Sequence, residues 1–204
     1  MSTTRAGPSR RRPHPDRDYA AFPDVGARND LQANIEVPCL LRALRLPRGG
    51  RVLEIGCGRG VALPVLAARL APSALVGVDI DSALLVVAED RARAAGLEAT
   101  LVHADVRALP LEAGSFDLVI DFGTCYHVGG GADGARQALA EVARVLRPGG
   151  LFVHETPVAQ HLAHPIRSFG RTLPWGAVPE LVRDRAAVLW AGRRRVASPG
   201  PARA

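Results

Sequence analysis

The sequence predicts a single α/β domain built on a doubly wound, mostly parallel β-sheet. Short apolar runs without alternating polar residues recur along the chain, and helical stretches follow most of them. Strands that are apolar on both faces must be covered by helices on both sides. Right-handed crossovers leave a doubly wound sheet as the economical topology. A chain of 204 residues is long enough for one such domain with a sizeable core.

The hydrophobic pattern places the elements in order. Strands are expected at 51–55, 74–80, 99–105, 115–123 and 151–156. Helices are expected at 61–71, 81–96 and 133–150, with Asp81 or Ser82 capping the second of them and Gly96 ending it. Residues 26–46 predict one or two helices that cover a ligand. Residues 179–195 predict two β segments, an antiparallel pair that closes the sheet edge. The domain is expected to span 18–196, with a helical cover at 18–48 and disordered tails at 1–17 and 197–204.

Composition limits the classes of partner. The net charge is +6, but all 26 basic residues are Arg, and arginine triplets stand near both ends at 10–12 and 193–195. This distribution favours a solvated surface over a nucleic-acid patch. The three cysteines match no metal-ligand or disulfide pattern, which indicates free buried thiols in a reducing compartment. No apolar run is long enough to span a membrane, and the N-terminus lacks a secretory signal. We therefore expect a cytoplasmic protein.

A glycine turn follows the first predicted strand and carries the first functional signal. Gly56, Cys57, Gly58 and Gly60 form a G-x-G-x-G pattern, whereas a dinucleotide turn requires a further spaced glycine where Val61 stands. Glu54 precedes the turn, and its carboxylate would repel a pyrophosphate. A cationic ligand reverses the sign of that interaction. The turn therefore favours a cation such as S-adenosylmethionine, which carries an ammonium and a sulfonium and no phosphate.

The stretch "VLEIGCGRG" resembles the first motif of class I S-adenosylmethionine-dependent methyltransferases. The resemblance covers residues 50–156 and includes "VGVDIDSAL", "HADVRALPLEAGSFD" and "FDLVIDFGTCYHV" in the same order. It implies a Rossmann-like, seven-stranded sheet, mostly parallel with an antiparallel C-terminal strand. It also implies S-adenosylmethionine as cofactor and an enzyme that transfers its methyl group.

The resemblance assigns cofactor contacts to the carboxyl ends of the strands. Asp79 accepts hydrogen bonds from the ribose hydroxyls, with a helix N-cap as the alternative role. Ile80 lies against the adenine, Asp105 accepts from its amino group, and Val106 donates a backbone N–H to the ring. For Asp105 the alternative is an Asx turn. The segment from Asp121 onward lines the reacting end.

Two residues after the fourth strand are the candidates for catalysis. His127 is the first, because its ordinary pKa suits a general base. Tyr126 is the second, as a positioning hydroxyl or an aromatic wall. The alternative for His127 is a capping or packing role. A loose group of His154, Glu155, His161 and His164 matches no metal-ligand spacing and predicts, at most, part of a substrate pocket. Arg28 is a candidate for the cofactor's carboxylate, whereas Asn29, Gln32 and Asn34 are interpreted as helix-capping residues.

The acceptor is predicted by elimination. The segment Asp121–Thr124 lacks the Asp/Asn-Pro-Pro-Tyr pattern of enzymes that methylate exocyclic amines of bases, and no paired-glutamate loop of protein arginine methyltransferases is present. A small-molecule acceptor with an oxygen or nitrogen nucleophile is therefore favoured. The alternatives are a cofactor-binding relative without catalysis, an RNA methyltransferase and, least favoured, a nicotinamide-dependent oxidoreductase.

Overall fold

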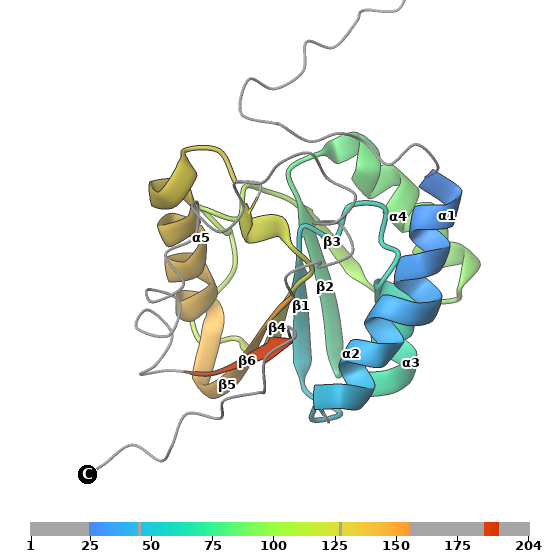
Figure 1. The fold of residues 1–204 in the computed structure, drawn as a ribbon, viewed down its shortest axis with the longest axis horizontal. Coiled ribbons are helices and arrows are strands. Elements are labelled where there is room, and N and C mark those ends of the chain that lie inside the picture. The colour runs from blue at the N-terminus through green and yellow to red at the C-terminus, as the bar shows by residue number, and fades with distance from the viewer. Residues whose placement is uncertain (1–24, 45, 127, 156–185, 192–204) are drawn as a thin grey trace, which may run out of the picture.

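The computed structural model describes residues 25–44, 46–126, 128–155 and 186–191, which form one sheet with helices on both faces (Figure 1). The strands are β1 (Arg51–Ile55), β2 (Ala74–Asp79), β3 (Thr100–His103), β4 (Phe116–Asp121), β5 (Leu146–Glu155) and β6 (Ala186–Ala191). The helices are α1 (Val25–Leu31), η1 (Gln32–Glu36, a π-helix), α2 (Val37–Leu44), α3 (Leu63–Leu70), α4 (Ser82–Ala94), η2 (Thr124–Tyr126, a 3₁₀-helix) and α5 (Gly131–Val145). The tails predicted at 1–17 and 197–204 lie outside the described residues.

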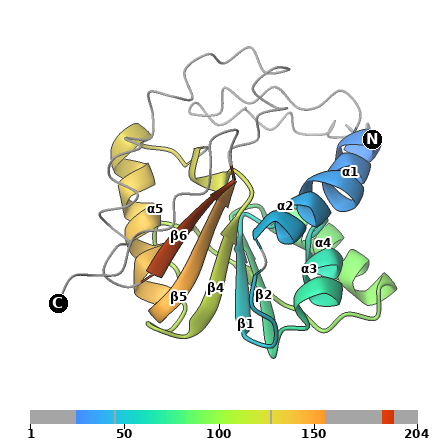
Figure 2. The same ribbon diagram turned by 60° about the horizontal axis from the view of Figure 1, so that its bottom comes forward.

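The strand order is β3-β2-β1-β4-β5-β6, and every ladder is parallel. The chain moves outward from β1 to β3, then returns beside β1 with β4 and moves outward in the other direction. Figure 2 shows the consequence: α5 covers one face of the sheet, whereas α2, α3 and α4 lie toward the other. The point where the order reverses, between β1 and β4, is where doubly wound sheets bind ligands.

Two apolar cores follow from the side-chain alternation of the strands. Leu53, Val119 and Phe152 join the core beneath α5. Their neighbours Val52, Leu118 and Val153 join the core beneath α2 and α3. Because both faces of β1 and β4 are covered, these strands contain apolar residues on both faces, as the sequence predicted.

The C-terminal side of the sheet differs from the expectation of an antiparallel pair. Ala186–Ala191 forms one strand that runs parallel to β5, with Val188 opposite Phe152. Residues 156–185 separate the two strands, and a connection of that length exceeds the dozen residues that a parallel crossover requires. The described residues form six strands rather than seven. The flanking parts of the predicted β segments, 179–185 and 192–195, lie outside them.

β5 begins five residues earlier than predicted, at Leu146 rather than Leu151. Leu146 pairs with Phe116 and Leu151 pairs with Leu118, so four residues of β5 lie opposite the single residue Asp117 of β4 and the register shifts by three. The segment Arg147–Gly150, predicted as the end of the helix at 133–150, is this irregularity, and α5 ends earlier, at Val145. Arg147 donates to the Asp117 carboxylate there, which ties the shifted segment back to β4.

The loop between β3 and β4 contains no helix and is held instead by α5. Arg144 donates to the backbone carbonyls of Leu109 and Leu111, each at 2.8 Å. Glu141 accepts from the Leu109 N–H at 2.7 Å and pairs with Arg144. Hydrogen bonds from this helix therefore hold the loop in position, although the loop has no regular secondary structure of its own.

No helix among the described residues has the length and apolar character needed to cross a membrane. The three cysteines are free thiols, as expected, but only Cys57 and Cys125 are buried, whereas Cys39 is exposed on α2.

Candidate functional site

A cavity of about 440 Å³ opens at the carboxyl ends of the first three strands. The glycine turn after β1, the ends of β2 and β3, the loop after β4 and helix α1 all contribute to its wall. Of the predicted cofactor residues, seven line it: Gly56, Cys57, Gly58, Asp79, Ile80, Asp105 and Val106. The topology brings these residues together because parallel strands end at the same edge of a sheet.

The three glycines of the turn have three different local roles, and all three have positive φ angles. A Cβ on Gly56 would lie 1.8 Å from Thr124 Oγ1, whereas a Cβ on Gly58 would meet nothing within 4 Å. Gly60 is not among the residues that line the cavity. A Cβ on Gly60 would lie 2.8 Å from the Ala88 side chain, so this glycine allows the turn to pack against α4.

Asp79 connects the end of β2 to the glycine turn. Its Oδ2 accepts from the Gly58 N–H at 2.7 Å and its Oδ1 accepts from the Asp81 N–H at 2.9 Å. The N-cap of α4 is Asp81, whose side chain accepts from the Ala83 N–H. The alternative N-cap role for Asp79 is therefore filled by another residue. Each carboxylate oxygen of Asp79 can accept a further hydrogen bond, and the residue lines the cavity.

Glu54 lies beneath the cavity rather than in its wall. Its side chain is 2% exposed, and Oε2 has no hydrogen-bond partner among the described residues. Burial, followed by the charges of Asp79 and Asp121, raises the pKa of Glu54 to about 8. Near neutral pH this carboxyl is therefore largely protonated, and a nearby cation would favour its ionised form.

Asp105 is bound by Arg107, two residues further along the chain. The Arg107 guanidinium donates to both carboxylate oxygens, and the Arg107 backbone N–H donates to Oδ1 at 2.8 Å. The backbone bond is the Asx-type contact that the sequence offered as an alternative. Hydrogen bonding to Arg107, partly opposed by burial, lowers the pKa of Asp105. Arg107 also donates to the carbonyl of Gly129, another residue of the cavity wall, at 3.0 Å.

Asp121 is completely buried at the end of β4 and supports the wall of the cavity from behind. It accepts from the backbone N–H of Thr124 at 2.5 Å and from Nδ1 of His154 on β5 at 2.7 Å. Burial alone would raise its pKa, but the charge of His154 and the hydrogen bonds hold the pKa below the ordinary value. Thr124 in turn donates to the Ile55 carbonyl at 3.0 Å. The loop after β4 is thus connected to the end of β1.

The predicted catalytic residues lie at the limit of the described chain. Tyr126 ends η2, but its side chain, together with His127, is outside what the structure describes. Of the loose group predicted around His154, only His154 itself has a described side chain: it is buried, and its Nδ1 donates to Asp121. His161 and His164 fall outside the described residues. No group of side chains within the described ranges could hold a metal ion.

The helical cover predicted from the sequence contributes polar residues to the cavity. Val25, Arg28, Asn29 and Gln32 line it, at the spacing that places residues on one face of a helix. Asn29 and Gln32 were interpreted as capping residues, and the structure places them in the cavity wall instead. Arg28 Nη1 donates to Glu36 Oε2 at 2.7 Å. These two side chains are eight residues apart, yet they lie on the same side of the helix, because the π-helix η1 has a wider turn than an α-helix.

Sequence reasoning missed Arg59 and Arg107, which both line the cavity. Each lies inside a motif in which only the glycines or the acidic residue were assigned a function. A basic residue close to a predicted ligand-binding acid, or within a glycine turn, could have indicated both of them. Thr124 was not predicted either, because its role depends on a hydrogen bond to Ile55 of β1, which is distant in the sequence.

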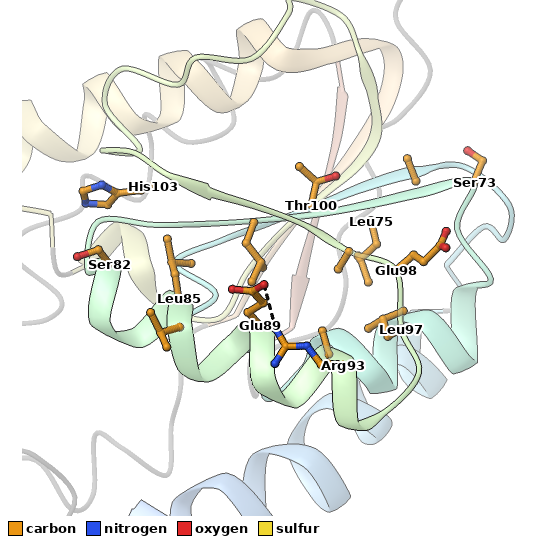
Figure 3. A pocket seen from close by; sticks show the side chains of 15 residues that line it. Ser73, Leu75, Ser82, Leu85, Glu89, Arg93, Leu97, Glu98, Thr100 and His103 are labelled. Carbon is orange, nitrogen blue, oxygen red and sulfur yellow. Dashed lines mark hydrogen bonds and ion pairs between the residues drawn. The ribbon is translucent and has the colours of Figure 1, made fainter.

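A second, more open depression of about 890 Å³ lies between β3 and α4 (Figure 3). Figure 3 shows Leu85, Glu89 and Arg93 of α4 along it, with the Glu89–Arg93 ion pair on its side. None of the predicted site residues lines this depression.

Residues 52–150 match the sequence model of a methyltransferase domain family. They contain the glycine turn, Asp79, Asp105 and Asp121, which the fold brings to one edge of the sheet. The chain belongs to the class I S-adenosylmethionine-dependent methyltransferases.

Two mycobacterial proteins are similar to this methyltransferase chain over part of their length. The chain is 38% identical over 107 residues to the phthiotriol/phenolphthiotriol dimycocerosates methyltransferase of Mycobacterium tuberculosis, covering 51% of this chain and 36% of that one. It is 35% identical over 170 residues to an uncharacterized Mycobacterium bovis protein, covering 80% and 57%. The first of these relatives is thus matched over about a third of its length.

A solved structure described as "Conversion of a Disulfide Bond into a Thioacetal Group during Echinomycin Biosynthesis" is 33% identical to this methyltransferase chain. The matched region covers 57% of this chain and 46% of the chain in the solved structure, with a TM-score of 0.50.

The described residues fit the methyl donor of this methyltransferase family. The cavity volume lies within the range of about 300–1,000 Å³ typical of small-molecule sites. The buried, unpaired Oε2 of Glu54 suits the ammonium group, and Asp79 suits two adjacent hydroxyls. Ile80 is 51% exposed at the cavity and offers an apolar surface to a purine.

Proposed function

We propose that the protein transfers a methyl group from S-adenosylmethionine to an oxygen or nitrogen atom of a small-molecule acceptor. The observation that carries this proposal is the meeting of the glycine turn, Asp79 and Asp105 around one cavity. Its supporting comparison is the M. tuberculosis relative, which is named as a methyltransferase of phthiotriol and phenolphthiotriol dimycocerosates. The bound donor supplies an activated methyl group, so the protein's own contribution is mainly alignment and exclusion of water.

The described residues would hold the donor along its length. Asp79 would accept from the ribose hydroxyls, Asp105 and Val106 would receive the adenine edge, and Glu54 would face the ammonium group. Gly56 and Gly58 permit close approach of the backbone because neither has a Cβ. Asp121 acts through the loop it caps, and His127 and Tyr126 remain the proposed residues at the reacting end.

Calorimetry tests the donor site directly. Wild-type protein should bind S-adenosylhomocysteine with micromolar or tighter affinity, and Asp79→Ala should abolish the binding. Asp90→Ala is a matched control because Asp90 is an exposed acid on α4 that pairs only with Arg93 in the described structure. Undetectable binding by the wild type would contradict the proposal.

A second experiment tests transfer to an acceptor. Labelled S-adenosylmethionine is incubated with panels of small alcohols, phenols and amines, and with RNA. The proposal predicts label in a small molecule and none in RNA. Reproducible binding of S-adenosylhomocysteine without transfer to any acceptor would favour a cofactor-binding protein without catalysis.

A further inference from the structure

The charges in the wall of the 440 Å³ cavity are not balanced. Five charged side chains line it: Arg28, Arg59, Asp79, Asp105 and Arg107. Arg28 pairs with Glu36, and Arg107 pairs with Asp105. Asp79 accepts two backbone N–H groups. These four residues therefore each have a partner within the protein.

Arg59 is different. No carboxylate or carbonyl of the described residues accepts a hydrogen bond from its guanidinium, although the residue is half-buried. The Arg59 backbone carbonyl accepts a hydrogen bond from the Arg91 Nε–H at 3.1 Å, which leaves the Arg59 guanidinium uninvolved. A partly desolvated guanidinium that has no internal anion is a site for an external one.

The backbone that carries Arg59 is held on both sides. Gly58 donates to Asp79, and the Gly60 N–H donates to the Cys57 carbonyl at 2.8 Å. Gly60 also packs against Ala88 of α4. Since the turn is fixed before any ligand binds, the guanidinium starts from a defined point and less ordering is required on binding.

We propose that Arg59 binds the amino-acid carboxylate of S-adenosylmethionine. This inference rests on the proposed function and adds the anchor for the donor's one anionic group. The carboxylate and the ammonium of the donor are attached to the same carbon atom, so their counter-charges must lie at the same end of the site. Glu54 and Arg59 satisfy this requirement, because Glu54 lies one residue before the end of β1 and Arg59 lies in the glycine turn that follows it. Guanidinium groups bind carboxylates through two parallel hydrogen bonds.

A ligand pair isolates this contact. S-Adenosylhomocysteine has the amino-acid group, whereas 5′-methylthioadenosine has the same nucleoside and thioether without it. Calorimetry with both ligands is performed on wild type, Arg59→Gln, Arg59→Lys and Arg28→Gln. Arg93→Gln is the matched control, because Arg93 lies on α4 away from the cavity and pairs with exposed acids.

Arg59→Gln should weaken S-adenosylhomocysteine binding by about tenfold or more, the effect of a lost charge-assisted contact. Its affinity for 5′-methylthioadenosine should stay within about twofold of wild type, and Arg59→Lys should restore part of the loss. Arg93→Gln should leave both affinities unchanged. The selective loss cannot come from general unfolding, which would weaken both ligands alike.

Equal weakening of both ligands in Arg59→Gln, or no weakening of either, would overturn the assignment. The same selective loss in Arg28→Gln but not in Arg59→Gln would overturn it too and move the anchor to α1. Wild-type protein that binds neither ligand would overturn the proposed function as well. The two failures are therefore distinguishable.

Discussion

At Glu54, the proposed binding of the donor's ammonium group and the stability of the fold place opposite demands on one carboxyl group. Its carboxyl is buried near two other acids, and its pKa in the folded protein is about 8 against an ordinary value of 4.5. The folded state therefore holds this proton more tightly than the unfolded state does. The contribution of Glu54 to stability is full below pH 4.5 and is progressively lost as the pH rises toward 8.

Glu54→Gln should therefore stabilise the protein at alkaline pH and weaken donor binding. The gain in unfolding free energy should grow by about 1.4 kcal/mol for each pH unit above 4.5 and level off near pH 8. Urea unfolding of both proteins at pH 5 and pH 8 measures the gain, and calorimetry with S-adenosylhomocysteine measures the loss. A stability difference that is equal at the two pH values would contradict the prediction.

The glycine turn offers a matched pair of substitutions. Gly56 and Gly58 both have positive φ, but only a Cβ at Gly56 would overlap Thr124. Gly58→Ala should cost about 1–2 kcal/mol of unfolding free energy, the cost of a left-handed alanine. Gly56→Ala should cost at least about 2 kcal/mol more, because overpacking is added. Equal losses in denaturant unfolding would show that the Thr124 contact relaxes freely.

At the scale of elements, α5 is the helix that organises the loop between β3 and β4. Arg144 donates to two loop carbonyls, and Glu141 accepts a loop N–H. The first residues of the same loop, including Asp105 and Val106, lie in the cavity wall. A helix on one face of the sheet thus supports part of the binding site at its edge.

Arg144→Gln should destabilise the protein by about 1–3 kcal/mol, because it leaves two loop carbonyls without their charged donor. Arg136→Gln is the control on the same helix: Arg136 is exposed and pairs only with Asp133 in the described structure, so its loss should change stability by no more than about 0.5 kcal/mol. Thermal unfolding of the two variants provides the comparison. Similar melting temperatures for both would contradict a supporting role of Arg144.

At the scale of the whole molecule, the three strand ends and α1 form one binding surface although they are far apart in sequence. Hydrogen exchange should therefore respond to S-adenosylhomocysteine at several places together. Slower exchange is expected at 56–60, 79–81, 105–107 and 28–32, because ligand binding suppresses local opening. The depression between β3 and α4, around 89–93, should not change. Protection confined to the depression would contradict the prediction, because it would show that the ligand binds between β3 and α4.

Much of the fold was predictable because its signals are local. The apolar runs of β1 to β4, the Asp81 cap and the ends of α3 and α4 depend on nearby residues. The direction of β6 was not predictable, because parallel and antiparallel edge strands have the same short apolar pattern. The early start of β5 was missed because Pro148 and two glycines indicate a turn, whereas pairing with β4 accommodates them as a register shift.

The sequence by itself determined the family, the strand-and-helix order and the acids that end the strands, because those features depend on residue type and spacing. Only the tertiary structure decided how the charges are paired. Arg107 binds Asp105, His154 binds Asp121, and Arg59 has no such partner among the described residues. Hydrogen bonds and burial depend on distances between segments that the chain order does not specify. The glycine turn lines a cavity in which Arg59, unlike Arg28 and Arg107, has no acidic partner among the described residues.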